Sequence, residues 1–162
     1  MIQIKDPEIK LPSFPKRKAT WRFVVHCSAT GPAQDIGVKE IDQWHRQRGF
    51  AAVGYHFVIR LDGTIESGRP VDSVGAHAAG YNATSIGICL AGGVDADDRN
   101  LARDTFSDKQ KAALAHLLDE LWLQYPQAAL YGHRDLDGVK KACPSFDVRK
   151  WWKNEAQKWL KK

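Results

Sequence analysis

The sequence predicts an α/β fold, a single domain with a central mixed β-sheet flanked by helices. Short strand-like runs alternate with longer segments of helical periodicity, which is the pattern of a sheet with helices packed on it. The chain has 162 residues, of which 43% are hydrophobic, enough to bury one core. No apolar run is long enough to span a bilayer, so no transmembrane segment is predicted.

The first residues differ in character from the rest of the chain. Residues 1–19 are expected to form a loosely attached N-terminal arm, and residues 20–162 the folded domain. The opening MIQIKDPEIKLPSFPKRK is polar, charged and broken by proline, so it lacks the apolar core of a signal peptide. Without an export signal, the three cysteines are expected to stay reduced.

The first half of the domain predicts three strands and one helix. In residues 20–26, TWRFVVH, aromatic and β-branched residues alternate at a period of two, which indicates a strand. Residues 38–49 have apolar side chains at helical spacing and end in a glycine that suits a helix terminus. Residues 53–68 predict a β-hairpin that turns at the Asp-Gly dipeptide 62–63.

The second half continues the alternation of strands and helices. The nearly continuous apolar run SIGICLAGG, residues 85–93, predicts a central strand. Residues 106–126 form the clearest helix, with a Ser-x-x-Gln capping box at its start, a leucine-rich stripe and a proline at its end. A final strand is predicted at residues 129–133 and a terminal helix, begun by an aspartate, at residues 147–162.

Two histidines end predicted strands, and a cysteine follows the second of them. His26 and His133 lie at the carboxyl ends of their strands, and Cys143 comes ten residues after His133. Neighbouring strands lie about 4.8 Å apart, so the two imidazoles can converge on one ion, and a cysteine on a returning loop could complete a zinc site with an open fourth position. The alternative is that His26 bonds to the backbone and Cys143 is a small buried hydrophobe.

Two lysines precede this cysteine. A metal-assisted hydrolysis develops negative charge on a carbonyl oxygen, and an ammonium group can stabilise that oxyanion. Lys141 or Lys140 could supply it, and only one is expected to reach the site because neighbouring side chains of an extended segment face opposite ways. Lysine pairs on loops are otherwise simply solvated.

Tyr55 is the other reactive candidate. If it faces the metal cleft, its phenol can orient water or donate a hydrogen bond to the oxyanion; otherwise it is a half-buried strand aromatic. His56 then points to the opposite face and packs beneath the sheet or meets solvent. His45 and His116 lie in predicted helices and are interpreted as structural.

Positive charge is concentrated towards the C-terminus. The net charge is +5, and residues 140–162 carry eight Lys or Arg against two acids. Such a surface favours an anionic polymer, membrane or lipopolysaccharide, although the basic, tryptophan-containing helix at 151–162 is expected mainly to pack on the sheet. The hypothesis that the protein binds a nucleic acid or a polymerase is supported by the positive charge alone.

Six motifs occur in a fixed order: HCSAT (26–30), VGYHFVI (53–59), DGT (62–64), GAHAAGYN (75–82), SIGICLAGG (85–93) and KACPSFD (141–147). Together they resemble the zinc-dependent N-acetylmuramoyl-L-alanine amidases of the amidase-2 group. This group is related to the peptidoglycan recognition proteins. The likeness is strongest to the lysozyme-named amidases of short-tailed bacteriophages, and it spans residues 21–152.

The resemblance implies a site in a groove on one face of the sheet. It implies one Zn²⁺ with three ligands: His26, His133 and Cys143. It implies two catalytic residues, Tyr55 and Lys141, which selects Lys141 over Lys140, and two residues that contact the glycan-peptide substrate, His77 and Asn82.

The implied activity is that of an endolysin. Zinc-activated water would hydrolyse the amide between N-acetylmuramic acid and L-alanine in bacterial peptidoglycan. The enzyme, expected to be a monomer, would wait in the host cytoplasm until the membrane is permeabilised and then lyse the cell wall.

The sequence is also compatible with three other functions. The first is a non-catalytic peptidoglycan-binding module on the same scaffold, which the presence of Cys143, Lys141 and Tyr55 disfavours. The second is a cysteine hydrolase with Cys27 as nucleophile, although adjacent strand residues such as His26 and Cys27 diverge. The third is a nucleic-acid-binding protein.

Overall fold

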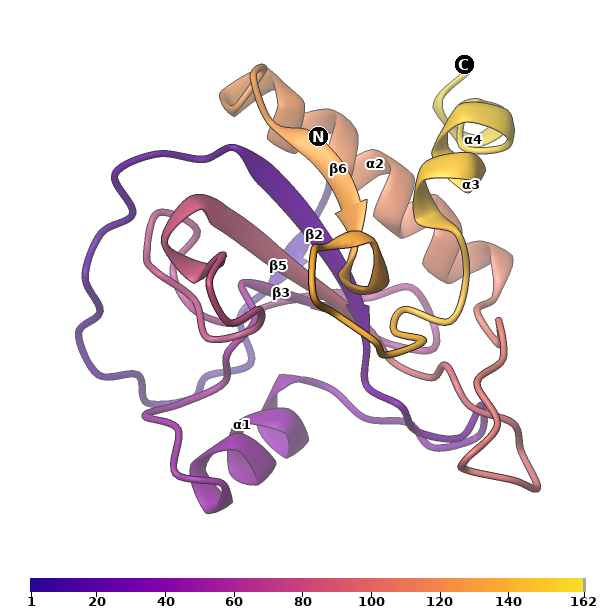
Figure 1. Cartoon of the computed structure of the whole chain (residues 1–162), viewed down its shortest axis with the longest axis horizontal. Helices are drawn as coiled ribbons and strands as arrows, with labels where there is room; N and C mark the ends of the chain where they lie inside the picture. Colours follow the sequence, from indigo (N-terminus) through magenta and orange to yellow (C-terminus); the bar gives the residue numbers. More distant parts are fainter. Residues whose placement is uncertain (162) are drawn as a thin grey trace.

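The computed structural model describes residues 1–161 and confirms the predicted α/β class (Figure 1). Within these residues, the strands form one mixed sheet in the order β1-β4-β3-β5-β2-β6. The strands are β1 (Ile4–Lys5), β2 (Arg22–Cys27), β3 (Phe57–Ile59), β4 (Ile65–Ser67), β5 (Ser85–Leu90) and β6 (Ala129–Gly132). The four neighbours from β3 to β6 run parallel, whereas the predicted hairpin joins β3 and β4 antiparallel.

Helices cover both faces of the sheet. The long helix α2 (Asp108–Gln124) packs its leucines on one face, together with α3 (Val148–Asn154) and α4 (Gln157–Leu160). Helix α1 (Val38–Gln47) lies on the opposite face, below the sheet in Figure 1. Because side chains alternate along a strand, odd-numbered residues of β2 enter the α2 core and even-numbered ones face the other layer. Within residues 1–161, no helix combines the length and apolarity needed to cross a bilayer.

The predicted capping box at the start of α2 is confirmed. Ser107 accepts the backbone N–H of Gln110 at 3.2 Å, and the side chain of Gln110 accepts the backbone N–H of Ser107 at 3.1 Å. Two orphan donors of the first helical turn are thereby satisfied. Gln110 also reaches into the interior, where its amide donates to the carbonyl of Ala91 at 2.8 Å, so the same residue ties the helix to the segment after β5.

The terminal helix is interrupted, which differs from the single helix that the sequence predicts. Asp147 caps its start as expected, accepting the N–H of Lys150. The chain leaves helical geometry at Glu155 before α4 begins. The tryptophans of this segment pack inward: Trp151 is buried, and the ring of Trp152 lies 4.8 Å from that of Trp122 in α2.

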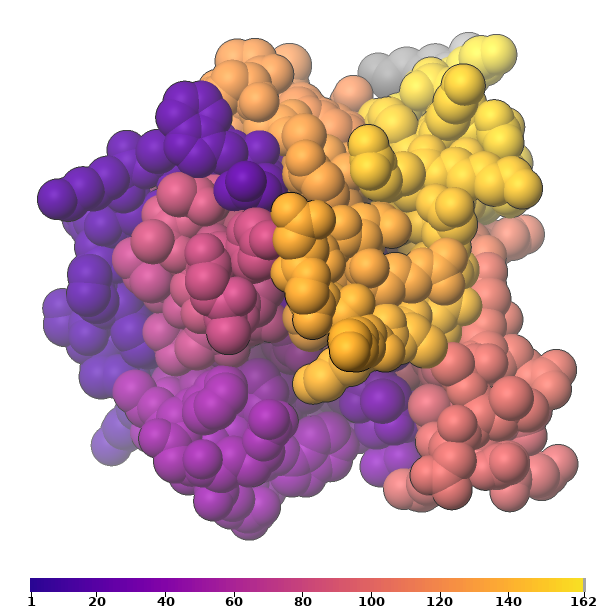
Figure 2. Space-filling model, viewed as in Figure 1, coloured from indigo at the N-terminus to yellow at the C-terminus, as the bar shows by residue number. Residues whose placement is uncertain are grey.

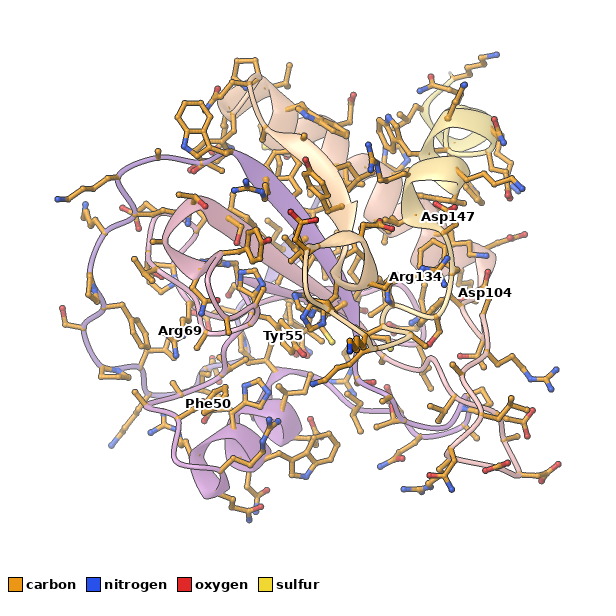
Figure 3. All side chains as sticks on the ribbon, in the orientation of Figure 1. Phe50, Tyr55, Arg69, Asp104, Arg134 and Asp147 are labelled. Carbon is orange, nitrogen blue, oxygen red and sulfur yellow. The ribbon has the colours of Figure 1, made fainter. Side chains whose placement is uncertain are left out.

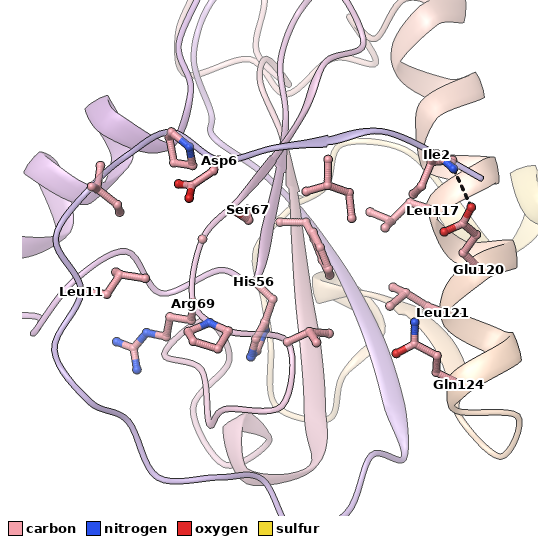
Figure 4. Close-up of a pocket in the computed structure, with 17 residues that line it drawn as sticks. Ile2, Asp6, Leu11, His56, Ser67, Arg69, Leu117, Glu120, Leu121 and Gln124 are labelled. Atoms are coloured by element: carbon pink, nitrogen blue, oxygen red, sulfur yellow. Dashed lines mark hydrogen bonds between the residues drawn. The ribbon is translucent and has the colours of Figure 1, made fainter.

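The N-terminal residues do not form a loosely attached arm, contrary to the prediction. β1 pairs in parallel with β4 and forms one edge of the sheet, and the N–H of Ile2 donates to Glu120 of α2 (Figure 4). Residues 2–11 cover an apolar cavity of about 430 Å³ against α2. The guanidinium of Arg69 stacks 4.1 Å from the ring centre of Phe14, which fixes the second half of the segment.

His56 is fully buried and does not meet solvent, and its ring centre lies 5.8 Å from that of His77. Its Nδ1 accepts the N–H of Gly87 at 3.0 Å, so its Nε2 carries the proton and donates to the carbonyl of Ser73 at 2.8 Å. Burial lowers the pKa of His56 to about 4. The neutral ring therefore joins the start of β3 to β5 and to the loop around residue 73.

This arrangement predicts a stability that declines in mild acid. An unfolded chain takes up a proton at its histidines near pH 6.5, whereas folded His56 stays neutral down to about pH 4. Stability is therefore full above pH 6.5 and falls as the pH drops towards 4, by up to roughly 3 kcal/mol from this residue. Urea unfolding between pH 7 and 4.5 measures the decline, which should be shallower in His56→Gln; equal slopes would contradict the assignment.

Candidate active site

The carboxyl ends of two adjacent parallel strands bring two histidines together. The register pairs Val25 of β2 with Gly132 of β6, so the next residues along the two strands, His26 and His133, emerge side by side. Their ring centres lie 4.5 Å apart. His133 opens a short 3₁₀ turn, in which Asp135 accepts the N–H of Gly132 at 2.7 Å and so fixes the backbone from which the imidazole projects.

Cys143 completes a cluster that could hold a metal ion. One ligand atom from each of His26, His133 and Cys143 lies within 4.8 Å of the other two. The Nδ1 atom of His26 is 3.9 Å from the Sγ of Cys143. Tetrahedral zinc with Zn–N near 2.0 Å and Zn–S near 2.3 Å separates such atoms by roughly 3.5 Å, so the residues fit this ion after a small contraction.

Backbone groups hold the cysteine in place. The N–H of Cys27 donates to the Sγ of Cys143 at 3.3 Å, and the N–H of Arg134 donates to its carbonyl at 2.8 Å. Contact with the Cys27 thiol, together with burial, raises the pKa of Cys143, so the bare thiol is disfavoured as an anion. A divalent cation would favour the thiolate, since metal ligation deprotonates cysteine.

Both histidines are held in the neutral form that metal ligation requires. Burial lowers the pKa of His26, and the neighbouring His77, His133 and Lys141 lower it further. Burial and the charge of Lys141 lower the pKa of His133. Their unprotonated ring nitrogens are therefore available to a cation across the neutral pH range.

Tyr55 lies beside this cluster, just before β3, on the side of the sheet that carries α1 (Figure 3). Its ring centre is 5.1 Å from that of His26. Burial raises the pKa of Tyr55 well above its usual value, as does the proximity of the cysteine thiols. The phenol thus keeps its proton and can act as a hydrogen-bond donor at the site.

The cluster lies in a groove of about 690 Å³ to which several chain segments contribute. Figure 2 shows residues near 45–55, 75–85 and 133–143 meeting on this face of the molecule. Lys140 and Lys141 both line the groove with exposed side chains. The positive charge of Lys141 lowers the pKa of both His26 and His133.

His77 and Asn82 also line the groove, but the fold already engages both ring nitrogens of His77 and the amide oxygen of Asn82. The Oδ1 of Asn82 accepts the backbone N–H groups of His77 and Ala78 at 2.8 and 2.9 Å. The Nδ1 of His77 lies 2.8 Å from the Nε2 of His26, and its Nε2 lies 3.2 Å from the hydroxyl of Ser85. Their contact with substrate stays a prediction.

The sequence does not predict one wall of the groove. His45, for which its place in a helix predicts a structural role, lines the groove with Arg48 and Phe50, and its ring centre lies 5.4 Å from that of Tyr55. It also has a structural role, since its Nδ1 accepts the N–H of Gly54 at 2.8 Å. The sequence does not distinguish these two roles, because residues on a buried helix face and residues that line a groove recur at the same helical spacing.

The alternative nucleophile, Cys27, is poorly placed for catalysis with His26. Its side chain belongs to the apolar core on the α2 side of the sheet and is buried. Its Sγ is 3.7 Å from the hydroxyl of Ser145. The adjacent His26 faces the other layer, as alternation along β2 predicts.

Known proteins share both this sequence and this fold. The family model for N-acetylmuramoyl-L-alanine amidases, Amidase_2, matches residues 16–146. An endolysin of Klebsiella phage KP32 is 52% identical over 143 residues, covering 88% of this chain and 92% of that protein. The endolysin of Escherichia phage T7 is 48% identical with the same coverage.

A solved structure agrees with these relatives. The endolysin N-acetylmuramoyl-L-alanine amidase LysCS from Clostridium intestinale has a TM-score of 0.75 and 30% identity, covering 91% of this chain and 90% of that one. The matched region contains the strand ends and the loop that form the His-His-Cys cluster. The chain therefore belongs to the N-acetylmuramoyl-L-alanine amidase family.

Proposed function

We propose that this protein is a phage-type endolysin that hydrolyses the amide between N-acetylmuramic acid and L-alanine in peptidoglycan and so lyses bacteria. The observation that carries the proposal is the meeting of His26, His133 and Cys143 in an open groove of a chain that is 52% identical to an endolysin. Hydrolysis needs a polarised carbonyl, an activated water and a stabilised oxyanion. Each requirement has a candidate group in the groove.

The three ligating side chains would hold one Zn²⁺. Two neutral imidazoles and a thiolate are a donor set that zinc favours, and three protein ligands leave a fourth position open, as in catalytic zinc sites. When bound there, the ion supplies a Lewis acid that polarises the scissile carbonyl and lowers the pKa of water. Cys27 would contribute through its backbone N–H, which donates to the ligating sulfur.

Two further side chains would act on the reacting atoms. Tyr55 keeps its phenolic proton because of its burial, so we assign it the role of hydrogen-bond donor to the attacking water or the oxyanion. Lys141 would place positive charge where the oxyanion develops. The influence of its charge on His26 and His133 supports this choice over Lys140.

The groove would receive the glycan and its stem peptide. Stem-peptide carboxylates suit the basic rim formed by Arg48 and the two lysines. We propose that residues 20–162 form the catalytic domain, that the protein acts as a monomer, and that it reaches the cell wall from the host cytoplasm after membrane permeabilisation. Contact of the basic C-terminal segment with an anionic membrane stays a prediction.

Removal of the cysteine ligand should abolish both metal binding and activity. Cys143→Ala should retain no zinc after dialysis, measured by elemental analysis, and should release no L-alanine amino termini from purified murein. The unaltered protein should release them without new reducing sugar ends, lose activity to a chelator and regain it with zinc. Cys27→Ala is the matched control and should keep its zinc and its turnover. Loss of turnover in Cys27→Ala with zinc retained would instead support a cysteine hydrolase.

The lysine pair offers an internal control for the oxyanion role. Lys141→Ala should keep stoichiometric zinc but lower kcat by about 100- to 1,000-fold, the usual effect of removing one oxyanion-stabilising group. Lys140→Ala, which removes the same charge one residue earlier, should remain near full activity. Rates on soluble peptidoglycan fragments distinguish the two variants. Full activity in Lys141→Ala would remove this residue from the mechanism.

A further inference from the structure

A chain of hydrogen bonds leads from His26 into the loop before β5. The Nε2 of His26 lies 2.8 Å from the Nδ1 of His77, and the Nε2 of His77 lies 3.2 Å from the Oγ of Ser85. The same hydroxyl donates to the carbonyl of Tyr81 at 2.7 Å. This series of hydrogen bonds therefore ends on the carbonyl of Tyr81, which can only act as an acceptor.

Because the carbonyl of Tyr81 can only accept, it determines which atom carries the proton in each of these hydrogen bonds. The single hydroxyl hydrogen of Ser85 points to the carbonyl of Tyr81, so its oxygen can only accept from His77. His77 must then carry its proton on Nε2, which leaves its Nδ1 as an acceptor. His26 donates to it from Nε2 and is left with an unprotonated Nδ1. This Nδ1 is the atom that lies 3.9 Å from the Sγ of Cys143.

Glycines hold the ring of His77 in the required place. A Cβ at Gly87 of β5 would lie 2.5 Å from the Cγ of His77, and one at Gly75 would lie 2.8 Å from its Cδ2. The imidazole therefore occupies space that a side chain at either position would fill. Asn82 accepts the backbone N–H of His77 at 2.8 Å, which ties the main chain at His77 to the turn at residue 82.

We propose that His77 is a positioning residue, which orients His26 and fixes its tautomer so that Nδ1 is presented to the metal. The proposal rests on the zinc site proposed above. It gives both nitrogens of His77 a task within the protein, in place of the predicted contact with substrate. Partners that orient a metal-ligating histidine in this way typically contribute 10- to 100-fold to metal affinity.

Two substitutions, whose side chains have nearly the same shape as each other, separate the effect of the hydrogen bond from the effect of packing. His77→Leu removes the acceptor, whereas His77→Asn places an amide oxygen close to the former position of Nδ1. Zinc affinity is measured by competition with a chromophoric chelator for the unaltered protein and both variants. We expect His77→Leu to bind zinc about 10- to 100-fold more weakly and His77→Asn to recover most of that loss. Equal affinity in His77→Leu, or no recovery in His77→Asn, would overturn the proposal.

A second measurement needs no substitution at His77. Nitrogen-15 NMR of histidine-labelled zinc protein should show His77 and His26 both protonated at Nε2, and Ser85→Ala should relax the single tautomer of His77. A proton on Nδ1 of His77 in the unaltered protein would overturn the proposed positioning role. Failure of the unaltered protein to bind zinc is a different result, because it removes the proposed metal site itself.

Discussion

The structure depends on the parallel pairing of β2 with β6. Their register places His26 and His133 in equivalent positions at the carboxyl ends of adjacent strands, where parallel sheets commonly form their binding sites. These histidines are distant in sequence, and no local segment could bring them together. The core beneath the sheet, packed by α2, secures this pairing, so the stability of the fold and the geometry of the ligand cluster are coupled.

Alternation along the strands separates the chemical site from the core. In β2, Cys27 belongs to the apolar core on the α2 side of the sheet while His26 faces the groove. In β5, Gly87 leaves space on the groove side for the ring of His77, whereas the flanking isoleucines fill the core. One strand therefore supplies hydrophobic packing on one face and room for a polar network on the other, as the period of two allows.

The sequence predicted the parts of this arrangement that local patterns determine. Strand periodicity located the ends at which His26 and His133 lie, and the capping box located α2. Local sequence patterns did not predict the contacts between residues that are distant in sequence. The pairing of Ile4–Lys5 with β4 depends on an edge that only the folded sheet presents, and His45 becomes a groove wall because α1 packs beside Tyr55. The bonds that turn His77 inward likewise join residues whose positions follow from the tertiary fold.

The central claim is that two imidazoles and one sulfur share a zinc ion, and X-ray absorption at the zinc edge tests it most directly. The protein purified with zinc should contain one ion per chain. Its spectrum should fit one sulfur near 2.3 Å and the remaining nitrogen or oxygen ligands near 2.0 Å. A protein that takes up no zinc, or a bound ion without a sulfur neighbour, would contradict the account.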